Sequence, residues 1–286
     1  MKGAALSFWL APFLARPIAL IGLGLLVAVA MAAAFAPWLA PYDPYAMAPI
    51  ARLMPPDATH WFGTDQFGRD TLSRTIYSAR MALLIGSGVV FFAMVTGVPV
   101  GVLSALFPRV GQVLMRMVDV LMAFPSLLLA LGLIVILGPS VVNSILAIGI
   151  GFMTTTTRIV YGLSLRLRAE TYVEAARSMG SGTVWLVFKH ILPNLISPLL
   201  VQASFVFAFA QLGAASLDFL GLGAPPEIPS WGNMLAESRT FITRASWLLF
   251  FPGLMIVLTA FSLNLVGDAL RDRLDPRFRD VFGGEG

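Results

Sequence analysis

The chain has no cysteine among its 286 residues, and only 12% of its residues are charged. Without thiols it can form neither disulfides nor thiolate metal sites. Histidine is almost as scarce, because His60 and His190 are the only two and stand far apart in the sequence. The residues needed for a transition-metal site are therefore missing, and we predict no metal ligands.

Apolar residues, in contrast, are abundant. They make up 58% of the chain, whereas soluble domains average about 45–50% apolar and about 25% charged residues. Together with a mean hydropathy of +0.84, this composition predicts an integral membrane protein in contact with lipid. Nucleic acid is not an expected partner.

The N-terminus has some features of a signal peptide, since Lys2 precedes an apolar run that reaches Leu14. Arg16 and Pro17 interrupt that run, and a second, longer apolar run follows immediately. We therefore favour an interfacial N-terminal segment that leads into a first membrane helix over a cleaved signal.

Six segments are apolar enough to cross a bilayer as helices, each of which needs roughly 20 residues for a core of about 30 Å. The predicted spans are 18–39, 81–107, 113–137, 141–161, 195–222 and 247–266, and a helical lead-in is predicted at 71–79. Prolines inside these spans predict kinks, which neighbouring helices make tolerable. They are Pro99, Pro125, Pro198 and Pro252. The predicted fold class is an all-α polytopic membrane protein with six transmembrane helices.

Basic residues are divided unevenly between the two sides of the predicted membrane. Thirteen fall in the termini and the alternate connections, and six fall in the others. Because basic residues concentrate on the cytoplasmic side, both termini and the loop at 170–193 are predicted to be cytoplasmic. We divide the chain into 1–80 (N-terminal segment, first span and outer loop), 81–268 (a core of five helices) and 269–286 (a cytoplasmic tail).

The loop at 170–193 is charged and helix-forming, and it lies between long apolar spans. Ala176 and Gly180 are four residues apart and present one face with almost no side chain, which lets another backbone approach closely. Trp185 and Phe188, spaced i and i+3, form an apolar pair of the kind that anchors a helix in a partner's groove. The alternative is an ordinary cytoplasmic helical hairpin without a partner.

This loop resembles the cytoplasmic loop of the membrane subunits of binding-protein-dependent ABC importers, with Glu-Ala-Ala, three residues, Gly, and later Leu-Pro. The matching residues are Glu174, Ala175, Ala176, Gly180, Leu192 and Pro193. His190 stands where the general pattern has isoleucine, and His-Ile-Leu-Pro-Asn is similar to the peptide and nickel branch of the family. Residues 63–74, 229–235 and 267–277 also resemble that branch.

The resemblance implies a non-catalytic permease subunit in the bacterial inner membrane that forms half of the translocation pathway for di- or oligopeptides. It also implies a homologous second permease, two ATP-binding subunits and an external binding protein as partners. ATP and Mg²⁺ would be bound by the partners, because Lys2 and Lys189 both lack the context of a phosphate-binding loop. The residues expected to couple to the ATPase are Glu174, Ala175, Ala176, Gly180, Trp185, Phe188, Lys189, His190, Leu192 and Pro193.

Other assignments stay open at this point. The same architecture would serve import of nickel or another small solute. An ion-coupled secondary transporter usually shows paired acids or broken helices in repeated halves, and the sequence shows neither repeated halves nor paired buried acids. A membrane-embedded enzyme would need a nucleophile–base pair or a metal cluster, and neither is evident.

Two acidic residues near the ends of spans need separate interpretation. Asp218, late in the fifth predicted span, either reaches outer water or faces the translocation cavity, where it would meet a cation. Relatives in the resembling family usually carry a small polar residue there. Asp119, near the inner end of the third predicted span, is expected to form a local ion pair with Arg116, one helical turn away.

Overall fold

The computed structural model describes residues 17–274. The predictions for residues 1–16 and for the tail beyond residue 274 lie outside the described residues. Within the described range the protein is helical, apart from loops and one isolated bridge between Thr64 and Asp70. In this range five helices are long and apolar enough to cross a membrane, and the number rises to six if a bent pair of shorter helices is counted as one span. The all-α polytopic fold is therefore confirmed.

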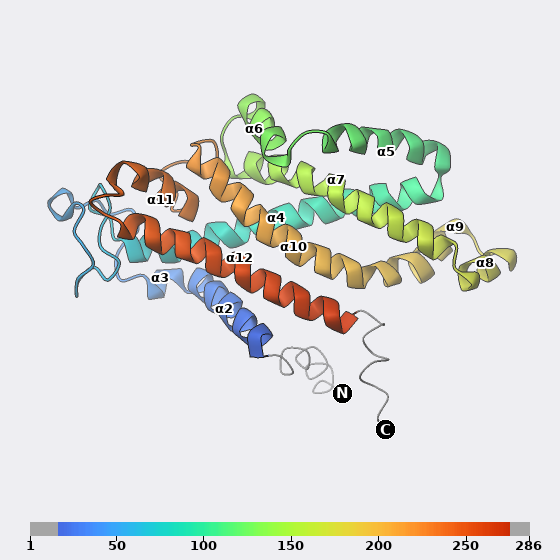
Figure 1. Cartoon of the computed structure of the whole chain (residues 1–286), viewed down its shortest axis with the longest axis horizontal. Helices are drawn as coiled ribbons and strands as arrows, with labels where there is room; N and C mark the ends of the chain where they lie inside the picture. The colour runs from blue at the N-terminus through green and yellow to red at the C-terminus, as the bar shows by residue number, and fades with distance from the viewer. Residues whose placement is uncertain (1–16, 275–286) are drawn as a thin grey trace, which may run out of the picture.

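The elements follow one another along the chain without any sheet between them (Figure 1). In order they are α2 (Pro17–Ala34), α3 (Ala36–Leu39), η1 (Pro49–Ala51), α4 (Thr71–Leu106), α5 (Pro108–Met122), α6 (Ser126–Leu137), α7 (Val141–Arg168), α8 (Thr171–Ser178), α9 (Thr183–Leu186), η2 (Val187–Ile191), α10 (Leu192–Phe219), α11 (Trp231–Ser238), η3 (Arg239–Phe241) and α12 (Trp247–Leu274).

Most predicted spans are single helices. The lead-in predicted at 71–79 is confirmed, because α4 begins at Thr71, and Asp70 caps it by accepting a hydrogen bond of 2.8 Å from the Ser73 amide. A capping carboxylate satisfies one of the free amides of the first turn. At the other end of the chain, α12 continues to Leu274, so the predicted boundary between core and tail falls inside a continuous helix.

The third predicted span, 113–137, is wrong as a single helix. It is divided into α5 and α6, whose axes differ by 91°. The break falls at Pro125, which lacks an amide hydrogen and also pushes the residue before it, Phe124, away from helical geometry. Pro99, Pro198 and Pro252 instead lie inside continuous helices.

The centre of the bundle is the contact between α4 and α7. A side chain at Gly101 would put its Cβ 2.8 Å from the Thr157 carbonyl oxygen and 2.8 Å from Val160 Cβ, so only glycine permits this approach. Small residues at helix contacts allow close packing where lipid provides no hydrophobic driving force. Val89 and Ala147 are fully buried in the same core.

The two ends of the bundle carry different structures. Figure 1 shows the α8–α9 hairpin at one end, and α11 with the irregular segment 40–70 at the opposite end. The first helix, α2, packs along α12 and α4, and Ala19 and Ala269 are buried together where α2 begins and α12 nears its end. The two structures at the ends are therefore joined by continuous helices.

Candidate functional site: the α8–α9 hairpin and the outer network

The α8–α9 hairpin is shaped by Gly180. This residue has φ +88°, a left-handed conformation that glycine adopts without steric cost. The Gly180 amide donates to the Arg177 carbonyl at 2.9 Å, and the Ser181 amide donates to the Ala176 carbonyl at 3.1 Å. These two bonds form a Schellman motif. Gly180 therefore ends α8 and aims the chain toward α9.

After the turn, the chain is helical without interruption from Thr183 into α10. Residues 187–191 form one π-helical turn between α9 and α10. Pro193, which has no amide hydrogen, lies directly after this π-helical turn, inside the continuous helix. The second half of the hairpin, from Thr183, is therefore continuous with a helix long and apolar enough to cross a membrane.

The inner face of the hairpin is a small apolar cluster. Ala176 is 5% exposed and packs with Val173 and Leu186. The expected shared face of Ala176 and Gly180 is therefore divided, because the Ala176 side chain is covered by its own chain and Gly180 is exposed. The His190 ring lies 5.1 Å from the Trp185 ring, measured between centroids.

The solvent-exposed surface of the hairpin carries the other predicted coupling residues. Those that are exposed are Glu174, Ala175, Gly180, Trp185, Phe188, Lys189 and Pro193, whereas His190 and Leu192 are half-buried. Two further apolar side chains, Met179 and Val184, are 81% and 71% exposed beside them. Sequence reasoning missed this pair, although Val184 and Phe188 share one face at i and i+4. The hairpin therefore presents several large apolar side chains that its own packing leaves uncovered.

At the opposite end, four charged side chains form an outer network. Arg69 bonds to Asp65 at 2.5 Å and to Glu237 of α11 at 2.7 Å. The Arg74 guanidinium is 1% exposed and lies 3.7 Å from Asp65 and 3.6 Å from Glu237. Burial raises the pKa of the Glu237 carboxyl, and the two nearby guanidinium groups oppose that rise. The network ties the outer loop to α11.

Tryptophan side chains reinforce this connection. The Trp231 indole donates to the Thr75 carbonyl at 3.0 Å, and the Trp247 indole donates to the Thr64 carbonyl at 3.3 Å. The stretches at 63–74 and 229–235 also lie side by side, because Arg74 and Met234 line the same small cavity. Their contact depends on side chains more than 150 residues apart in the chain.

Asp218 lies at the end of α10 and is 3% exposed. Its carboxylate accepts 2.7 Å from the Ala224 amide and 2.6 Å from the Ser230 hydroxyl. Ser230 in turn caps α11. The side chain lines a cavity of about 20 Å³, which is room for about one water molecule. Asp218 thus connects α10 with the loop and α11, and its contact with a substrate stays a prediction.

Asp119 forms an ion pair, as predicted, but its partner is not Arg116. The Asp119 carboxylate instead pairs with Arg158 of α7. Arg158 was counted only as a cytoplasmic basic residue, although it lies inside the predicted span 141–161, where a charge requires a partner or water. That unexplained charge within a span was the signal from which the pair could have been predicted.

The helical bundle, its glycine-turned hairpin and its outer network together define a polytopic membrane protein with an exposed helical hairpin at one end. Comparison with known proteins identifies the family. Residues 97–280 match the family described as binding-protein-dependent transport system inner membrane component, and residues 7–56 match the N-terminal transmembrane domain of oligopeptide transport permease C. The chain belongs to this family of transport-system membrane components.

Several relatives are similar over most of their length. The chain is 42% identical to a di/tripeptide transport system permease protein of Pseudomonas aeruginosa, covering 92% of this chain and 89% of the relative. It is 41% identical to a dipeptide transport system permease protein of Alkalihalophilus pseudofirmus, covering 92% and 86%. A glutathione transport system permease protein of Pectobacterium atrosepticum is 39% identical, covering 96% and 91%.

Among solved structures, a chain of the methionine ABC transporter, described in inward-facing conformations, has a TM-score of 0.61. It is 19% identical and covers 71% of this chain and 97% of its own. This likeness shows that the two chains share a fold.

Proposed function

We propose that this chain is one of two permease subunits of an ATP-driven peptide importer in the bacterial inner membrane. The observation that carries the proposal is the 41–42% identity, over about nine-tenths of the chain, to permeases named for dipeptides and di/tripeptides. The subunit forms half of the translocation pathway for the peptide. It performs no covalent chemistry, and separate ATPase subunits bind ATP and Mg²⁺.

The α8–α9 hairpin is the proposed contact with an ATPase subunit. Its exposed apolar side chains, among them Trp185 and Phe188, fit the anchor role of a helix that docks in a groove. Lys189 lies near the end of the π-helical turn and adds a positive charge to the docking surface. Because the hairpin continues into α10, ATP-driven motion of the ATPases would tilt this helix and switch the pathway between its outward- and inward-open states.

Co-expression with the neighbouring transport subunits tests the proposal. We expect a tagged form of this chain to co-purify with a second permease and two ATPases. With the external binding protein and ATP, the complex in proteoliposomes should accumulate a dipeptide such as alanyl-alanine. A chain that purifies alone, or a complex that accumulates nickel but no peptide, would overturn the assignment. Omission of ATP is the matched control.

The proposed orientation places both termini and the hairpin in the cytoplasm, and it rests on the thirteen-to-six division of basic residues. A reporter fused after Gly286 should be active only in the cytoplasm. Because the chain has no native cysteine, a single Gln66→Cys variant should react with a membrane-impermeant thiol reagent added from outside. The opposite labelling pattern would contradict the six-span arrangement.

A further inference from the structure

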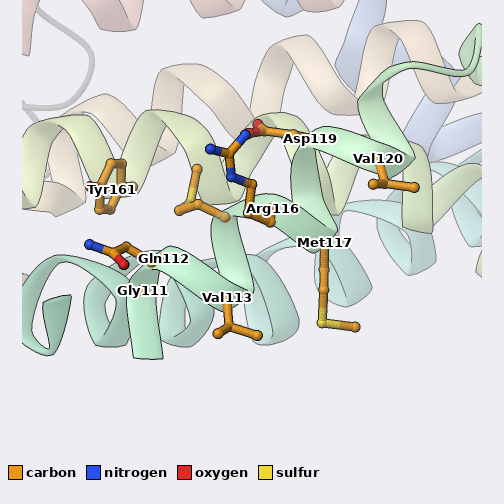
Figure 2. A pocket seen from close by; sticks show the side chains of 9 residues that line it. Gly111, Gln112, Val113, Arg116, Met117, Asp119, Val120 and Tyr161 are labelled. Carbon is orange, nitrogen blue, oxygen red and sulfur yellow. The ribbon is translucent and has the colours of Figure 1, made fainter. Parts of the chain in front are cut away.

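The α5 helix has a polar stripe near the inner end of the third predicted span that the hairpin and the outer network leave unexplained. Gln112, Arg116 and Asp119 follow one another at i, i+4 and i+7, so they share one face of the helix. Figure 2 shows Arg116 and Asp119 on the opposite side of α5 from Val113 and Met117. The polar stripe turns toward α7.

An open surface pocket of about 860 Å³ runs along α5, and the polar stripe lines its α7 side together with Tyr161 of α7 (Figure 2). Its size is within the range of about 300–1,000 Å³ found for small-molecule sites. Asp119 pairs here with Arg158, yet the two side chains keep 43% and 50% of their surface exposed. The ion pair is accessible from the pocket.

The depth of these charges indicates what faces them. Arg158 lies inside the predicted span 141–161, three residues from its inner end, which is about 5 Å along the helix axis. An ionisable side chain within a span is costly against lipid, and it normally faces a bundle interior or water. The face formed by Gln112, Arg116, Asp119, Arg158 and Tyr161, here called the α5–α7 polar face, therefore borders water rather than lipid.

We propose that the α5–α7 polar face binds the charged termini of a zwitterionic peptide in the cytoplasmic half of the pathway, an inference that rests on the proposed function. Asp119 accepts hydrogen bonds from the α-ammonium group, and Arg116 donates two parallel hydrogen bonds to the α-carboxylate. Arg158 holds Asp119 in place when no peptide is bound.

The lining also explains how such a site would accept varied peptides. Met115 borders the pocket beside the polar stripe, and methionine side chains adapt to irregular apolar shapes. The site would recognise the two terminal charges that all unblocked peptides share, and the flexible thioether would accommodate their different side chains.

Transport by charge variants gives the first test, in proteoliposomes that contain the complete complex, the binding protein and alanyl-alanine. Asp119→Asn and Arg116→Gln should each lower the maximal uptake rate roughly tenfold, as expected from the loss of a charge-assisted hydrogen bond. Arg109→Gln is the matched control, because Arg109 is on the same helix but does not line the pocket. It should change the rate less than about twofold, a result typical of surface substitutions.

An exchanged pair separates this site from a merely structural ion pair. Asp119→Arg combined with Arg158→Asp keeps the attraction between α5 and α7 but inverts the charges that the peptide meets. Uptake by the exchanged variant should stay as low as that of Asp119→Asn. Recovery to the wild-type rate would overturn the proposal. A wild-type complex that imports no dipeptide would instead contradict the proposed function itself.

Thiol labelling tests the site while Arg116 and Asp119 are both intact. A single Gln112→Cys variant should react readily with a small water-soluble reagent on the cytoplasmic side, and alanyl-alanine at saturating concentration should slow the reaction severalfold. N-acetyl-alanyl-alanine amide, which lacks both terminal charges, should not slow it, and Asp119→Asn should abolish the protection. An unreactive cysteine, or equal protection by the two peptides, would overturn the proposal.

Discussion

Replacing Gly180 with leucine is expected to reduce substrate-stimulated ATP hydrolysis and uptake to near background, while the subunit still inserts into the membrane. Gly180 has φ +88°, and a left-handed conformation costs an L-residue with a side chain roughly 1–2 kcal/mol. The bulky side chain would also be added to an exposed surface where the ATPase is proposed to dock. Measurements of ATPase activity and uptake in proteoliposomes, with the amount of inserted subunit determined by immunoblot, check the result.

Gly182 offers a matched control two residues away. It has φ −67°, and a Cβ at this position would meet no atom within 4 Å. Leucine is therefore conformationally permitted there, and Gly182→Leu should retain substantially more coupled ATP hydrolysis than Gly180→Leu. Full uptake by Gly180→Leu at normal expression would contradict the docking role of the hairpin.

Substitution of Asp218 by alanine is the second change with a large expected effect. It leaves the Ala224 amide and the Ser230 hydroxyl without their acceptor, and each buried group left unsatisfied costs about 1–3 kcal/mol. Because Ser230 caps α11, its new freedom would also loosen α11 from α10. We expect a lower thermal transition of the purified complex and a loss of uptake that is the same for cationic and neutral peptides.

The comparison of substrates distinguishes the two roles of Asp218. A loss confined to cationic peptides, most clearly in Asp218→Asn, would show instead that the carboxylate meets the substrate. Ser216→Ala is a suitable control, because the Ser216 hydroxyl is on the same helix and donates only to the Leu212 carbonyl, at 2.7 Å. It should leave both the thermal transition and uptake nearly unchanged.

The sequence was sufficient for those features that depend on local pattern. Runs of apolar residues located the spans, and Thr171 to Gly180 was recognisable as a helix that ends at a glycine. The bend at Pro125 could have been predicted, because the proline coincides with a change from a stretch that contains charges to a purely apolar one. The prediction relied on the length of the segment alone and therefore treated α5 and α6 as one span.

Contacts between residues far apart in the chain could not be predicted from the sequence. Arg69 and Glu237 are separated by 168 residues, and Asp119 and Arg158 by 39, so neither contact follows from helical spacing. Ala176 illustrates a second limit. Periodicity identified a face with small side chains, but not that Leu186 of the same chain covers part of it, because the direction of the following helix is set by the turn at Gly180.

The bend between α5 and α6 makes this subunit uneven in its hydrophobic thickness. The α6 helix has 12 residues and is about 18 Å long, whereas α4 with 36 residues is about 54 Å long. A hydrocarbon core of about 30 Å is thicker than α6 is long and thinner than α4 is long. Lipid beside α6 would therefore have to thin locally, unless part of α5 or a neighbouring subunit covers this side of the protein.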